Sequence, residues 1–267
     1  MRRFIFGLLL LSFLPFSNVY AWGKKGHDVI AEIGQRRLTP KAEKKVTEIL
    51  GGRSMVYYSN WMDAVRNDKE YKYTSTWHYI NIEKGETLES TERAKSGDVL
   101  SGIEHAVAIL KEGSVKGSTK YSKEEQSDAL KMLIHMVGDL HQPMHVGRKK
   151  DLGGNTIKVQ YFNDSTNLHS LWDSKIVEGA HAWSYSEWAD QLDRAGLVSD
   201  SRVAIITSGC YEDWLKEVVE HANHVYSKSP IGARISYDYL AEFTPVVEEV
   251  FLHGGLRLAH ILNEIYK

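Results

Sequence analysis

The sequence predicts an all-α fold. Only five prolines interrupt 267 residues, and apolar residues recur at helical spacing along nearly the whole chain. One segment, residues 155–162, alternates apolar and polar residues as a strand does, after a double-glycine turn. No repeat, low-complexity tract or linker divides the sequence. We therefore expect a single domain of many helices with one small β-hairpin.

The first 21 residues predict a cleaved signal peptide. Arg2 and Arg3 precede an apolar run over residues 4–16, and a small-residue exit ends at Ala21. This run is too short to span a bilayer. We expect a secreted or periplasmic protein, not bound to a membrane after cleavage, whose domain covers residues 22–267.

Three internal helices have start and stop signals. Threonine and serine precede the first and third as N-caps, Gly97-Asp98 opens the second, and the first has proline at its first helical position. The first helix ends at Gly51-Gly52, the second near Gly113 and the third before Gln142-Pro143. The predicted helices cover residues 40–50, 98–113 and 122–140. In the last stretch, 234–266, we expect two helices on either side of His253-Gly254-Gly255.

Net charge and cysteine content restrict which partners the protein can bind and what can stabilise its fold. The net charge is −2, so no wide basic surface gathers polyanions, and a nucleic acid must be bound locally by metals or a few cations. The single cysteine, Cys210, excludes an intramolecular disulfide. We expect it to be a small buried residue.

Two histidine/aspartate pairs favour a metal site. His135 and Asp139 lie four residues apart, and His169 and Asp173 repeat this spacing, which puts both side chains of a pair on one helix face. Zinc takes imidazole nitrogen and carboxylate oxygen as ligands. One such pair is most often a surface ion pair. Two pairs with His145 between them favour zinc over that alternative.

The start of the domain adds a further donor. Cleavage before Trp22 would free an α-amino group close to His27, and an amine beside an imidazole can bind a metal ion. The alternative is an ordinary signal peptide whose mature terminus has no function.

Taken together, these motifs resemble a known family. The chain resembles the zinc-dependent single-strand nucleases of the S-one/P-one type, in order and over nearly the whole mature length. This likeness implies a phospholipase C/nuclease-like fold. The motifs that carry it are Trp22-Gly-x-x-Gly-His27, Trp61-Met-Asp63-Ala-Val-Arg66, Trp77-His78-Tyr79-Ile80, His135-Met-Val-Gly-Asp139-Leu-His-Gln-Pro-Met-His145, Asp151-Leu-Gly-Gly-Asn155, Asn167-Leu-His169-Ser-Leu-Trp-Asp173 and Gly255-Leu-Arg257-Leu-Ala.

The resemblance implies three Zn²⁺ ions and nine protein ligands. Two ions would lie close together, bridged by Asp139. One of them would take the amine and carbonyl of Trp22 with His27, and the other Asp63, His78 and His135. The third ion, somewhat apart, would take His145, His169 and Asp173.

Two residues are expected to act in catalysis and three in substrate binding. Asp63 would accept or orient the proton of the attacking water, and Arg66 would bind the phosphoryl oxygens; a salt bridge to a ligand carboxylate is the alternative for Arg66. Tyr79 would stack on an unpaired base, or belong to the core. Asn81 would contact the base, and it stands where many relatives carry an acidic residue that reads the base edge. Asn155 would line the site or form a turn.

The activity implied by the resemblance is hydrolysis of phosphate esters. The substrates would be single-stranded RNA and DNA, cleaved to 5′-phosphorylated products, and nucleotides that lose a 3′-phosphate. We expect a monomer and, without disulfides, a bacterial type of secreted member.

Two other functions compete with this one. A zinc-dependent phospholipase C would place glutamate where Asp173 stands and a longer gap between the terminal tryptophan and its histidine. A non-catalytic zinc-binding protein would not need Asp63 and Arg66. The histidines outside the motifs have no ligand spacing that indicates a second metal site.

Overall fold

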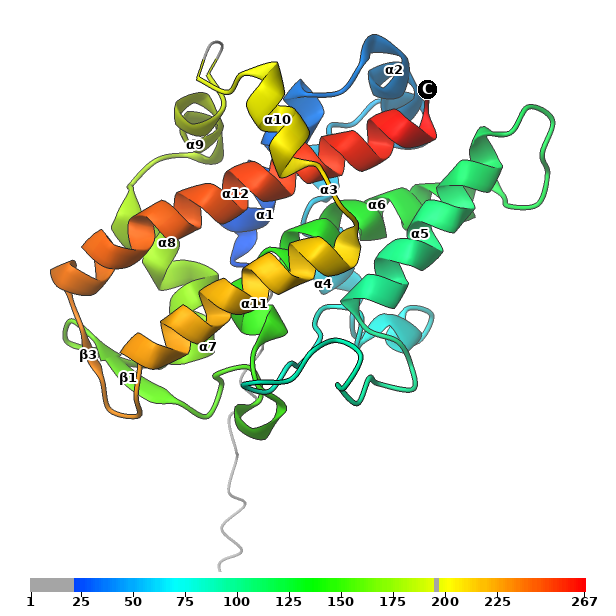
Figure 1. Ribbon diagram of the computed structural model, residues 1–267. Coiled ribbons are helices and arrows are strands. Elements are labelled where there is room, and N and C mark those ends of the chain that lie inside the picture. The colour runs from blue at the N-terminus through cyan, green and yellow to red at the C-terminus, as the bar shows by residue number, and fades with distance from the viewer. Residues whose placement is uncertain (1–21, 195–196) are drawn as a thin grey trace, which may run out of the picture.

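Helices form most of the protein. The computed structural model describes residues 22–194 and 197–267, so the predicted leader lies outside the described residues. The long helices are α1 (Lys24–Arg36), α5 (Val99–Ser114), α6 (Lys123–Leu140), α11 (Tyr211–Lys228) and α12 (Tyr237–Ile265) (Figure 1). The all-α prediction, with a small β element, is confirmed.

Short helices connect the long ones. They are α2 (Pro40–Ile49), α3 (Met55–Tyr58), α4 (Trp61–Val65), α7 (Leu168–Ser170), α8 (Ile176–Ala180), α9 (Tyr185–Leu192) and α10 (Asp200–Ile206). Single turns of 3₁₀-helix are η1 (Lys72–Thr74), η2 (Pro143–Val146) and η3 (Lys149–Asp151), and η4 (Leu171–Lys175) is a π-helical turn.

The predicted N-caps of α2 and α6 and the predicted start of α5 are confirmed. The Thr39 side chain accepts a hydrogen bond from the Ala42 amide, and Asp98 accepts from the first amides of α5. Ser122 and Glu125 form a reciprocal capping box at the start of α6. Each cap satisfies amides that the helix itself leaves unpaired, which is why these starts can be predicted from local sequence.

The prediction of two helices in the last stretch is wrong. α12 runs unbroken from Tyr237 to Ile265 through Gly254 and Gly255. A Cβ atom on Gly255 would lie 2.5 Å from the Ile33 side chain of α1. The glycine therefore permits close packing of α12 on α1, where its sequence context indicated a turn.

A small three-stranded sheet lies at one edge of the helices. β1 (Lys158–Tyr161) and β2 (Asp164–Asn167) form the predicted antiparallel hairpin, and β3 (Arg234–Ile235) pairs with β1 in parallel. The strand order is β2-β1-β3. The hairpin leads directly into α7 and thereby fixes the start of the segment 168–175.

The core extends to the first described residue. Trp22 is fully buried, and its ring meets the ring of Phe251 edge to face at a centroid distance of 4.9 Å. Cys210, expected to be buried, is exposed instead and stands at the N-terminus of α11. Within the described ranges, the helices are all too short or too polar to span a membrane.

Candidate metal centre

Seven segments bring histidines and aspartates to one place. α1 carries His27, and α6 carries His135 and Asp139 on one face near its C-terminal end. The loop after η1 supplies a further histidine, and α4, η2, α7 and η4 supply one residue each. These five residues are His78, Asp63, His145, His169 and Asp173.

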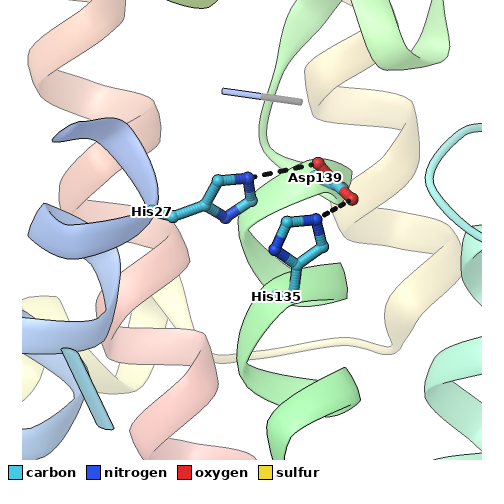
Figure 2. A group of neighbouring side chains, drawn as sticks. All are labelled: His27, His135 and Asp139. Carbon is cyan, nitrogen blue, oxygen red and sulfur yellow. Dashed lines mark ion pairs between the residues drawn. The ribbon is translucent and has the colours of Figure 1, made fainter. Parts of the chain in front are cut away.

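Asp139 lies at the middle of the group and is fully buried. Its Oδ2 atom is 3.0 Å from His78 Nδ1 and 3.2 Å from His135 Nε2. Its Oδ1 atom is 3.5 Å from His27 Nε2, on the other side. Figure 2 shows the rings of His27 and His135 directed at the two oxygens of this carboxylate. One carboxylate can therefore bridge two cations.

A glycine permits this approach of α1 and α6. The His27 and His135 rings stack at a centroid distance of 4.0 Å. A Cβ atom on Gly138 would lie 2.5 Å from His27 Nδ1. Because any side chain at this position would displace the His27 ring, Gly138 is part of the site although it offers no ligand atom.

A second donor group lies on the far side of Asp139. His145 Nε2 and His169 Nε2 are 3.8 and 3.5 Å from the two carboxylate oxygens of Asp173. The fully buried Gln142 donates a hydrogen bond of 2.6 Å to Asp173 Oδ1 and accepts one from the Met144 amide. Gln142 thus fixes the orientation of Asp173, a role that the spacing of the motifs does not reveal.

The imidazole tautomers fit metal ligands. Nδ1 of His135, His145 and His169 each donates a hydrogen bond of 2.7 Å to a backbone carbonyl, so Nε2 is the nitrogen directed inward. Metal-bound histidines have this arrangement, with the second nitrogen held by a carbonyl or carboxylate.

Several inward atoms have no hydrogen-bond partner although they are buried. They are both ring nitrogens of His27, Asp63 Oδ1, His78 Nε2, Asp139 Oδ1 and His145 Nε2. Buried polar atoms are rarely left unsatisfied. Three sets could each hold a metal ion, with all donor atoms of a set within 4.8 Å: His27/His135/Asp139 and Asp63/His78/His135, which share His135, and the separate set His145/His169/Asp173.

The charges of the buried donors depend on one another. Burial opposes ionisation of Asp139, but His135 and His145 beside it hold its pKa well below the ordinary aspartate value. Burial likewise opposes protonation of His135, yet the Asp139 and Asp63 carboxylates raise its pKa to about 9. Asp139 is therefore an anion that attracts a cation placed among these rings.

Two further groups favour a cation in the same place. Burial lowers the pKa of His27 to about 4, and the nearby His135 adds to the effect, so this imidazole is neutral, the form that binds metal. Burial raises the pKa of Asp173 well above the ordinary value, against its hydrogen bond from Gln142. A buried carboxylate of this kind ionises when a cation lies beside it.

A cavity of about 310 Å³ opens onto these donors. Asp63, His78, His145 and His169 line it together with Met144 and Gly153. Arg66 lies on its wall, with Nη1 4.0 Å from Asp63 Oδ1. The position agrees with both interpretations of Arg66, since it neighbours a ligand carboxylate and reaches the open cavity.

The three predicted substrate-binding residues also line the cavity. Tyr79 is 39% exposed, so it is not a core residue. Asn81 donates a hydrogen bond of 2.8 Å to the Gly147 carbonyl, and Asn155 donates one of 2.8 Å to the Leu152 carbonyl, which makes Asn155 both a turn former and a lining residue.

Two lining residues have no signal in the sequence. Leu152, with a left-handed φ of 55° and 64% exposure, and Ser75 both face the cavity. A non-glycine residue at positive φ is uncommon and is found disproportionately at functional sites.

Trp22, the first described residue, lies near the second donor group. The Gly23 amide donates a hydrogen bond of 2.5 Å to the Asp173 carbonyl. Trp22 therefore lies beside η4, close in sequence to His27 and close in space to Asp173. Its role as a ligand, like that of the other predicted site residues, stays a prediction.

Comparison with known proteins agrees with this geometry. The family model described as S1/P1 Nuclease matches residues 22–267. Endonuclease 2 of Arabidopsis thaliana is 31% identical over 274 residues, which cover 93% of this chain and 92% of that protein. Nuclease P1 of Penicillium citrinum is 28% identical (92% and 98% covered), and Nuclease S1 of Aspergillus oryzae is 27% identical (92% of each). The chain belongs to the S1/P1 nuclease family.

Proposed function

We propose that this nuclease is a secreted or periplasmic zinc enzyme that cleaves single-stranded RNA and DNA to 5′-phosphorylated products. It also removes the 3′-phosphate from nucleotides and acts as a monomer. The observation that carries the proposal is the set of buried, unsatisfied imidazole and carboxylate atoms, of which those of Asp63, His78 and His145 belong to residues that line a cavity with an arginine on its wall.

The donor set supports three zinc ions. His27 and Asp139 with Trp22 would bind one, and Asp63, His78 and His135 with Asp139 a second; the third would take His145, His169 and Asp173. Nitrogen and oxygen donors without thiolate are typical of catalytic zinc sites, which keep positions open for water and substrate. When bound, such ions activate water and neutralise charge on the phosphate and the leaving oxygen.

The chain itself supplies positioning and charge. Asp63 Oδ1 has no hydrogen-bond partner and faces the cavity, so it can accept a proton from, or orient, the attacking water. Arg66 can donate to the phosphoryl oxygens as negative charge develops on them. Tyr79 offers an exposed ring for stacking, which needs a base that is not held in a duplex.

Cleavage by the mature protein tests the activity. Protein starting at Trp22 should cleave single-stranded DNA and RNA and dephosphorylate a 3′-nucleotide, and a chelator should abolish all three reactions. Hydrolysis of phosphatidylcholine in place of nucleic acid would favour the phospholipase alternative. Full cleavage in the presence of chelator would contradict the zinc proposal.

An arginine variant separates turnover from metal storage. Arg66→Met should lower kcat by about 10²- to 10³-fold with its zinc content retained, because a lost transition-state donor acts on this scale. Arg53→Met is the control, since Arg53 lies over the exposed Tyr57 ring, remote from the cavity lining. Equal kcat in the two variants would remove Arg66 from the mechanism.

A further inference from the structure

A second group of glutamates and histidines lies between α11 and α12, outside the cavity. Glu217 and His221 are four residues apart on α11, and Glu249 and His253 are four apart on α12. Each helix therefore presents a Glu/His pair on one face, one turn apart. This is the same i, i+4 arrangement as that of His135 and Asp139.

The two pairs face each other. His253 Nδ1 is 2.6 Å from Glu217 Oε1, and His221 Nε2 is 3.8 Å from Glu249 Oε2. Donor atoms of Glu217, Glu249 and His253 all lie within 4.8 Å of one another. Neighbouring ligands around a tetrahedral zinc ion at ~2.0–2.1 Å are roughly 3.3 Å apart, so the observed spacings lie on both sides of that value.

An unsatisfied imidazole marks this group too. Among the described residues, the buried ring nitrogens of histidine without a hydrogen-bond partner all belong to the metal centre except one, His221 Nε2. Burial lowers the pKa of His221, which favours the neutral ring with a free lone pair. His221 thus shares a property of the predicted zinc ligands His27, His78 and His145.

Arg257 sets the charge balance of the group. Its Nη2 donates a hydrogen bond of 2.6 Å to Glu217 Oε2, and its Nη1 lies 3.3 Å from Oε1 and 3.0 Å from His141 Nε2. Glu217 and Arg257 neutralise each other. No lysine or arginine of the described chain forms an ion pair with Glu249, so the two carboxylates exceed the one guanidinium by one negative charge.

We propose that Glu217, His221, Glu249 and His253 form a further divalent-cation site that joins α11 to α12. Its nitrogen and oxygen donors suit zinc. An ion bound to both helices stabilises the folded state in proportion to its occupancy. None of the four residues lines the cavity, so the site is structural and cleavage of nucleic acid does not require it.

Zinc counting under buffered free zinc tests the site. Wild-type protein should carry one zinc ion per chain more than Glu249→Gln or His253→Gln, and zinc should raise the melting temperature less in these variants. Glu242→Gln is the matched control, because Glu242 also joins α12 to a histidine of α11, His224, at 2.8 Å but belongs to no three-donor set. The control should keep the wild-type zinc content.

Either of two results would overturn the proposal. One is a wild-type zinc content in Glu249→Gln, whose exposed side chain makes misfolding an improbable explanation. The other is the absence of an anomalous zinc peak between α11 and α12 in crystals of the zinc-loaded wild type. Both readouts are independent of cleavage, so failure of this site and failure of the proposed nuclease activity can be told apart.

Discussion

Among single substitutions in the metal centre, we expect replacement of Asp139 to lower the zinc content most. Its two oxygens face His27 on one side and His78 and His135 on the other. Replacing it by asparagine removes the negative charge that both close ions would share. We expect Asp139→Asn to lower the zinc content by two ions per chain, as measured by elemental analysis.

The control for this change lies on the same helix. Asp128 of α6 binds Lys131 and Tyr71 at the surface, away from the metal centre, so Asp128→Asn should keep its zinc. An Asp139→Asn protein with the wild-type zinc content would contradict the bridging role.

Gln142 should increase the affinity of the protein for the third ion, although Gln142 is not itself a ligand. It holds Asp173 Oδ1 by a 2.6 Å hydrogen bond. Removal of a residue that orients a metal ligand commonly costs 10- to 100-fold in affinity. We expect a loss of about this size in Gln142→Met, as measured by titration against a competing chelator, with one ion affected. Gln126→Met, elsewhere on α6, should bind all ions as the wild type does.

Asn81 should set a preference among bases. Its amide nitrogen is committed to the Gly147 carbonyl, so its oxygen remains as the group that can accept a hydrogen bond from a substrate. We expect 3′-nucleotides with an exocyclic amino group to have the higher kcat/KM. Asn81→Ala should reduce this preference by about 2- to 10-fold, the worth of one hydrogen bond. An unchanged ratio between adenine and uracil nucleotides would exclude Asn81 from base recognition.

At the scale of elements, α1, α6 and α12 position the metal centre by close packing. Gly255→Ala should lower the free energy of unfolding by about 1–3 kcal/mol, because its Cβ would lie 2.5 Å from Ile33. This overpacking exceeds the gain of up to about 1 kcal/mol from alanine's helix propensity. Chemical denaturation measures the difference.

A second helical glycine provides the comparison. A Cβ on Gly113 would meet only the end of the flexible Gln126 side chain. Gly113→Ala should therefore be neutral or stabilising. Equal destabilisation by the two substitutions would show that close helix packing is not the reason for glycine at 255.

At the scale of the whole molecule, the start of the chain should control the metal centre. Trp22 is buried in the core and the Gly23 amide is bonded to Asp173. Residues added ahead of Trp22 would convert the proposed amine ligand into an amide. We expect the loss of about one zinc ion. Cleavage should fall on the order of 100-fold, the scale of effect that follows when a residue that orients a metal ligand is removed.

The same extension placed after Lys267 serves as control, because that end is exposed. Full activity and zinc content with an uncleaved leader would rule out the terminal amine. Amino-terminal sequencing of exported protein, with Trp22 as the expected first residue, tests the cleavage position itself.

Most helices could be predicted because their signals are local. The caps Thr39, Asp98 and Ser122 satisfy amides of their own helices, so neighbouring residues determine these starts. The glycines of α12 gave the wrong prediction because their role is set by Ile33, a residue more than 200 positions away. β2 is polar and β3 is only two residues long, and their pairing with β1 depends on the fold.

The sequence alone determined the chemical identity of the donors and their grouping on helix faces, because i, i+4 spacing is a property of one helix. Only the tertiary structure decided that donors from seven segments meet around Asp139, that Gln142 and Gly138 shape their arrangement, and that the Glu/His pairs of α11 and α12 face each other. Such contacts join residues far apart in sequence, and packing between helices, which no local pattern encodes, brings them together.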